Sequence, residues 1–85
     1  MSKESGDALV AKGDKQMKGG WFRRADPDAA SQAYKDAANA YRAAGEWELC
    51  VGAYEKAAAA FAKNGVGFYA GEMLESAALI AKDKL

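Results

Sequence analysis

The feature that most constrains the fold is the placement of glycine and proline, which divides the chain into segments of similar length with short connections between them. Asp26-Pro27-Asp28 is typical of a helix start, and Gly45 and Asn64-Gly65 are typical of helix ends. Ser5 is the expected N-cap of the first segment. The boundaries predict helices over residues 5–18, 27–44, 46–63 and 66–83. Because one or two residues join most of them, neighbouring helices should run antiparallel.

The second and third segments repeat each other at an offset of 20 residues. Tyr34, Ala37-Ala38 and Tyr41 match Tyr54, Ala57-Ala58 and Phe61, which are at equivalent positions of the next segment. The repeat predicts an all-α fold of antiparallel hairpins, stacked as a tetratricopeptide-like right-handed superhelix within a single domain, residues 1–85. Alanine-rich helices also resemble one another by composition alone, so a chance repeat is the alternative.

The apolar residues suit thin helices that pack closely. Hydrophobic residues make up 51% of the chain, but many of them are alanine, and there is no threonine, which a β-sandwich would be expected to use. The fourth segment should present an apolar face at Met73, Leu74 and Ile80 with nothing after it to cover this face. We therefore expect the chain to be the N-terminal part of a longer solenoid.

The first connection, residues 19–25, departs from this pattern because two large aromatic residues and two arginines follow a pair of glycines. Residues 1–25 contain six basic and three acidic residues, although the whole chain has a net charge of zero. One hypothesis is that the aromatics cover the first helix as a plug. The other is membrane contact, since tryptophan favours the bilayer interface and cations attract anionic headgroups. The candidate membrane-contact residues are Trp21, Phe22, Arg23, Arg24 and Lys18.

No set of residues in the sequence indicates catalysis. There is no histidine, and Cys50 lies on the apolar face of the third segment, where a core role is expected. Lys12, Lys15 and Lys18 are expected to form a solvated helix face. The zero net charge does not favour nucleic-acid binding. We expect no enzyme activity, no cofactor, no metal and no small-molecule substrate.

The stretch from Lys18 to Arg42 resembles the soluble NSF-attachment proteins (SNAPs), the gamma type more than the alpha type. The resemblance lies in Trp21-Phe22, Asp26-Pro27-Asp28 and the helix from Tyr34 to Tyr41, and it extends to Trp47 and the alanines of residues 57–60. It implies an adaptor in vesicle-mediated transport and membrane fusion. Such an adaptor binds SNARE complexes, recruits the ATPase N-ethylmaleimide-sensitive factor (NSF) for SNARE disassembly, and contacts membrane through the loop that holds Trp21 and Phe22.

The resemblance also implies a cytoplasmic protein on the cytosolic face of membranes, in agreement with a single cysteine and no long apolar run. Family members are much longer and contain a C-terminal segment that engages the ATPase, so we expect these residues to correspond to the N-terminal part alone. No SNARE-binding residue can be assigned by position.

Two alternatives remain. The first is a generic tetratricopeptide-like module that binds a peptide and has no membrane role. A groove for an acidic peptide would need converging cations. The two inner segments contain at least as many acidic as basic residues, the latter being Lys35, Arg42, Lys56 and Lys63. The second is a structural fragment with no activity of its own.

Overall fold

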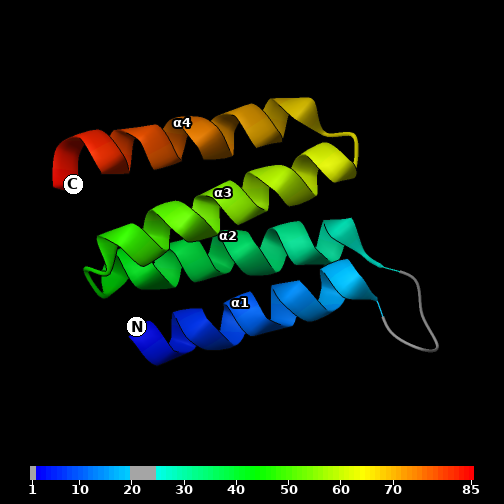
Figure 1. Cartoon of the computed structure of the whole chain (residues 1–85), viewed down its shortest axis with the longest axis horizontal. Helices are drawn as coiled ribbons and strands as arrows, with labels where there is room; N and C mark the ends of the chain where they lie inside the picture. The colour runs from blue at the N-terminus through cyan, green and yellow to red at the C-terminus, as the bar shows by residue number, and fades with distance from the viewer. Residues whose placement is uncertain (1, 20–24) are drawn as a thin grey trace.

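The computed structural model describes residues 2–19 and 25–85, and these residues form an all-α structure. The predicted all-α class and its four helices are confirmed (Figure 1). The helices are α1 (Lys3–Lys18), α2 (Pro27–Ala43), α3 (Trp47–Lys63) and α4 (Gly67–Lys84).

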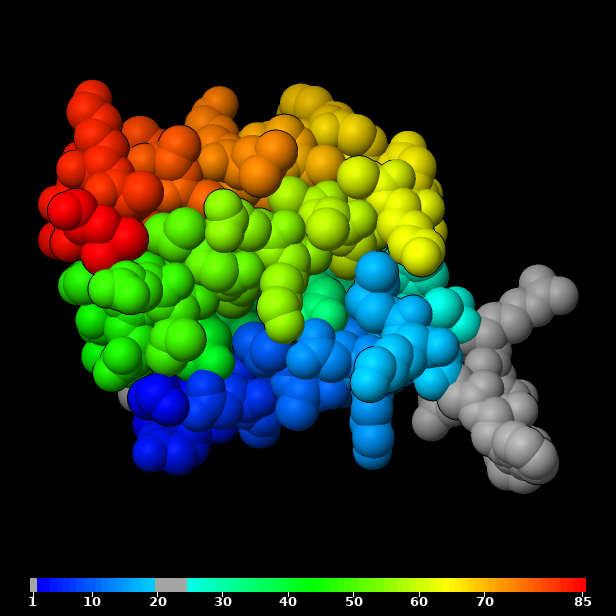
Figure 2. Space-filling view, viewed as in Figure 1, coloured from blue at the N-terminus to red at the C-terminus, as the bar shows by residue number. Residues whose placement is uncertain are grey.

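Each helix packs against the next helix in the chain, so that α1 contacts α2, α2 contacts α3 and α3 contacts α4. The result is a slab with Cα extents of 41 × 28 × 13 Å, in which α1 and α4 form the two long edges (Figures 1 and 2). This arrangement is consistent with stacked helical hairpins. Alternating helix directions bring Lys18, Asp26, Lys63 and Val66 to one end of the slab, which we call the Lys18 end.

Local sequence explains where the helices begin and end. The Asp26 side chain accepts a hydrogen bond from the backbone N–H of Ala29 (3.1 Å), and Pro27 follows it at the first helical position. Gly45 and Gly65 turn the chain after α2 and α3 with φ of 74° and 79°, a conformation that glycine adopts without strain.

The first helix begins two residues before its expected start. The cap is Ser2 and not Ser5, because the Ser2 hydroxyl accepts a hydrogen bond from the backbone N–H of Ser5 (3.3 Å). Either serine satisfies the sequence preference for an N-cap, and a cap at Ser2 in place of Ser5 lengthens the helix by most of a turn.

The core combines alanines that allow close helix contact with a small number of large side chains. The large buried side chains of α2 and α3 come from the repeated positions, where Tyr34, Tyr41, Tyr54 and Phe61 are all buried. Cys50 is fully buried among them, as expected for a core residue. The partly buried residues packed against this core are Leu9, Val10, Met17, Trp47, Val51 and Val66.

The outer face of α4 differs from its sequence-based description. Met73 and Ile80 are buried against the rest of the core, whereas Leu74 is 53% exposed. Leu74 is the equivalent of the buried Tyr34 and Tyr54 at the 20-residue offset. The difference arises because α4 lies at an edge of the slab. Its main contact among the described helices is with α3, so the side of α4 that faces away from α3 stays uncovered.

Candidate functional site

The connection between α1 and α2 is closed at its base by backbone hydrogen bonds. The N–H of Asp26 donates to the carbonyl oxygen of Gln16 (2.7 Å), and the N–H of Gly19 donates to the carbonyl oxygen of Lys15 (3.1 Å). Gly19 has a φ of 67°, which ends α1. These contacts fix the points at which the chain leaves α1 and enters α2, both at the Lys18 end.

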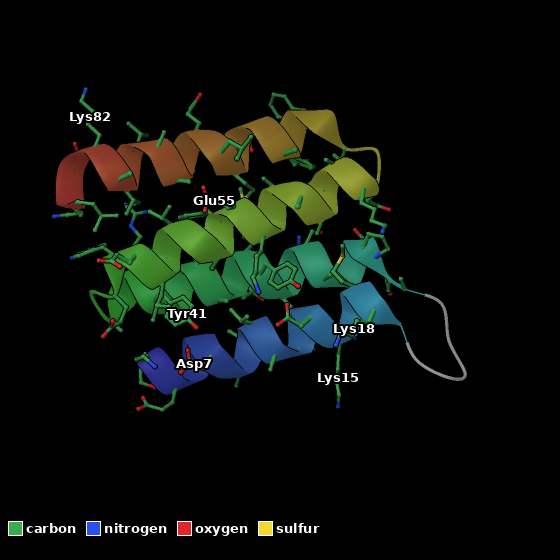
Figure 3. The ribbon with its side chains drawn as sticks, in the orientation of Figure 1. Asp7, Lys15, Lys18, Tyr41, Glu55 and Lys82 are labelled. Atoms are coloured by element: carbon green, nitrogen blue, oxygen red, sulfur yellow. The ribbon has the colours of Figure 1, made fainter. Side chains whose placement is uncertain are left out.

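Four of the predicted membrane-contact residues, Trp21, Phe22, Arg23 and Arg24, lie outside the described residues. The fifth, Lys18, is the last residue of α1 and its side chain is exposed, next to the base of the connection (Figure 3). Whether the two aromatics cover α1 or contact a membrane therefore stays a prediction.

A row of lysines extends from Lys18 along the exposed side of α1. Lys12, Lys15 and Lys18, together with Ala8 and Ala11, line a shallow surface that also includes Asp14. Lys15 and Lys18 belong to the last turn of α1, where a cation interacts favourably with the negative end of the helix dipole. The expected solvated face is present, and it places two cations at the Lys18 end.

The interface between α1 and α2 contains a paired motif that the sequence analysis missed. Gly6-Asp7 and Gly13-Asp14 recur at a spacing of seven residues on α1, and Tyr41 and Tyr34 have the same spacing on α2. Each tyrosine ring packs on a glycine, and its hydroxyl donates a hydrogen bond to the following aspartate (Figure 3 shows Asp7 and Tyr41). The Tyr34–Asp14 hydrogen bond is 2.5 Å long.

Two lysines complete these polar pairs. Lys3 Nζ lies 2.9 Å from the Asp7 carboxylate, and Lys56 Nζ of α3 lies 3.3 Å from Asp14. The same Lys56 nitrogen is 5.7 Å from the centroid of the Tyr34 ring. A side chain of α3 therefore reaches α1 across α2. These polar pairs join α1, α2 and α3. The seven-residue spacing shared by the Gly-Asp pairs of α1 and the tyrosines of α2 was the sequence signal that could have revealed them.

The hydrogen bonds shift the pKa values on both sides of the interface. The Tyr41 hydroxyl lowers the pKa of Asp7, with a further contribution from Lys3, and the Tyr34 hydroxyl lowers the pKa of Asp14. Burial, followed by the aspartate partner, raises the pKa of Tyr41 to about 12 and raises that of Tyr34. Both shifts favour an ionised aspartate beside a neutral tyrosine at neutral pH.

These shifts predict a loss of stability at both ends of the pH scale. The aspartates have lowered pKa values in the folded state, so the stability they contribute is present above about pH 4 and is lost as the pH falls through the folded values. The tyrosines have raised pKa values, so their contribution is present below about pH 10 and is lost as the pH rises further. Urea unfolding measured across this range should therefore show a maximum at intermediate pH.

The control for this prediction is the double variant Tyr34→Phe/Tyr41→Phe, which keeps both rings and removes both hydroxyls. Its stability should change less steeply with pH at both extremes, because neither tyrosine can ionise and the aspartates lose their principal donors. Identical pH profiles for the variant and the parent would contradict the prediction.

Cys50 has the environment of an unreactive thiol. Its side chain is fully buried, and this burial raises the pKa of the thiol. In the part of the chain that the structure describes, no group of three or more metal-ligating side chains comes together. Within the same residues, no helix has the length and apolarity needed to cross a bilayer.

Comparison with known proteins gives no further assignment. The chain matches no protein-family model and no curated protein sequence.

Proposed function

We propose that this chain is a non-enzymatic adaptor that attaches to an anionic membrane surface through its Lys18 end. In line with its resemblance to the SNAPs, it is the membrane-contacting N-terminal part of a protein that binds SNARE complexes and recruits NSF. Its stacked hairpins are the first turns of a tetratricopeptide-like right-handed superhelix. The proposed location is the cytosolic face of a membrane.

The observation that carries this proposal is the closed base of the α1–α2 connection. Because the N–H groups of Asp26 and Gly19 both donate to the last turn of α1, the two described residues that flank this connection lie at one end of the slab. Lys15 and Lys18 lie beside that base. In the sequence, a pair of aromatics and a pair of arginines stand between Gly19 and Asp26. Aromatic and basic residues together are the combination that an anionic bilayer interface binds.

The expected affinity of one copy is low. Each aromatic side chain contributes at most about 2–3 kcal/mol on burial, and each nearby basic residue contributes about 1 kcal/mol on an anionic leaflet. Association and ordering costs offset much of this gain. Useful attachment would then require several copies on one scaffold, which raises the effective concentration.

The test is co-sedimentation with vesicles that contain phosphatidylserine, at low and high salt. The parent chain should sediment with the vesicles, high salt should weaken its binding, and a Trp21→Ser/Phe22→Ser variant should stay in the supernatant with unchanged helicity. Failure of the parent to sediment would contradict membrane attachment. Unfolding of the variant would show instead that the two aromatics belong to the core.

The second candidate is a helical-repeat module that binds a peptide or protein and has no membrane role. The exposed leucines on the outer side of α4, Leu74 and Leu79, favour it, because a partner helix could cover them. A parent chain that never sediments with vesicles would make this candidate the better one.

A further inference from the structure

We propose that the corner between α3 and α4, residues 63–69, is a second contact with the anionic lipid surface. This inference rests on the proposed membrane attachment and adds to it a contact made by described residues. The contact side chains are Phe68 and Tyr69 at the start of α4, with Lys63 at the end of α3.

Phe68 is the first observation behind this assignment. Its side chain is 74% exposed, more than any other large hydrophobic residue in the described part of the chain. It lies in the first turn of α4, immediately after Gly67. A phenylalanine held at a helix start with its ring in solvent gains free energy when an apolar phase covers it.

The ring of Phe68 is supported by a row of aromatics that leads from the core to the surface. Phe61 is buried, and its ring centroid lies 5.4 Å from that of Tyr69. The Tyr69 ring in turn lies 5.6 Å from that of Phe68, and both pairs are tilted. Because Phe68 contacts a half-exposed ring that itself packs on the buried Phe61 ring, its ordering cost on entering an interface is reduced.

The corner lies at the same end of the slab as the base of the α1–α2 connection. The alternating helix directions place the start of α4 and the end of α3 at the Lys18 end, and Figure 2 shows the corner in yellow at that end of the molecule. A flat surface that meets one connection can therefore meet the other. Two contacts from one chain bind a surface more tightly than either contact alone.

Charge at the corner also fits an anionic surface. Lys63 is exposed in the last turn of α3, and the first turn of α4 contains no acidic residue. Phe68 and Tyr69 can thus approach lipid phosphates without bringing a carboxylate from their own turn. Asp26 and Asp28 at the start of α2 are the opposing charges at this end, so binding should be modest and sensitive to salt.

The experiment compares four chains by co-sedimentation with vesicles of phosphatidylcholine mixed with phosphatidylserine. They are the parent, Phe68→Ser, Phe68→Leu and Leu79→Ser. Leu79 is the matched control, since it is 55% exposed on the same helix but more than two turns further from the Lys18 end. Far-UV circular dichroism checks that all four are equally helical.

Phe68→Ser is expected to lower the vesicle partition coefficient by about ten-fold, whereas Phe68→Leu should keep most of the binding. Leu79→Ser should bind as the parent does. Equal losses in Phe68→Ser and Leu79→Ser, or no loss in Phe68→Ser, would overturn the inference.

A fifth chain, Trp21→Ser/Phe22→Ser, separates the two proposals. If this chain loses binding while Phe68→Ser keeps it, membrane attachment stands and the corner has no part in it. If the parent itself does not bind the vesicles, both proposals fail together.

Discussion

Replacing Gly6 and Gly13 together by alanine should lower the free energy of unfolding by about 2–4 kcal/mol. A Cβ atom on Gly13 would lie 2.5 Å from Cε1 of Tyr34, and one on Gly6 would lie 2.5 Å from Cε1 of Tyr41. Such distances are impossible, and both rings are buried and hydrogen-bonded to the neighbouring aspartates. The α1–α2 contact must therefore open, at a cost that exceeds the gain of about 1 kcal/mol per residue that alanine brings to a helix interior.

The matched control is Gly52→Ala/Gly71→Ala, which makes the same chemical change in the interiors of α3 and α4. A Cβ atom at either position has no heavy atom within 4 Å outside its own local helix backbone. The free energy of unfolding of this control should rise by about 0.5–1 kcal/mol per site, because alanine has a higher helix propensity than glycine. Urea unfolding followed by circular dichroism measures both variants. If Gly6→Ala/Gly13→Ala proved as stable as this control, the tyrosine rings could pack on α1 without glycine at these two positions.

Phe61→Ala is the second substitution for which we expect a large effect. It should lower the free energy of unfolding by about 3–5 kcal/mol. Phe61 belongs to the core cluster, contacts the Tyr69 ring of α4, and its carbonyl oxygen accepts the N–H of Val66 at the α3–α4 turn. Removing its ring leaves a cavity between the last turn of α3 and the first turn of α4. A loss of this size is comparable with the whole stability of a small domain, so the variant should be largely unfolded well below the thermal midpoint of the parent chain.

The control for this prediction is Phe68→Ala, seven residues further along the chain. Because Phe68 is mostly exposed, its removal should change the free energy of unfolding by no more than about 0.5 kcal/mol. Thermal unfolding followed by circular dichroism compares the two variants. Similar losses at both positions would contradict the assignment of Phe61 to the core and Phe68 to the surface.

The helices and their ends could be predicted from the sequence because the interactions that set them are local. Asp26 caps the segment that it precedes, and Gly45 and Gly65 turn the chain wherever the tertiary structure places them. The choice between Ser2 and Ser5 was missed, since two serines three residues apart offer the same capping group to overlapping helices. The alternation of helix direction also followed from the short connections.

The candidate site was predictable only in part. Lys18 was expected to be exposed and it is, but residues 21–24 lie outside the described part of the chain. The exposure of Phe68 was not predicted. An aromatic residue after Gly67 suits a core as well as a surface, and its exposure depends on how α4 is rotated against α3.

What the sequence alone determined about this protein is therefore its set of helices, the turns that end α2 and α3, and the antiparallel order of the helices, all of which depend on neighbours within a few residues. The tertiary structure alone decided which side of each helix is covered. The 20-residue repeat places Leu74 where Tyr34 and Tyr54 are buried, yet Leu74 is exposed because α4 is at an edge. The tyrosines of α2 meet Gly6 and Gly13 because two helices with the same seven-residue spacing pack in one register. Such choices depend on contacts between residues far apart in the chain, which no local pattern specifies.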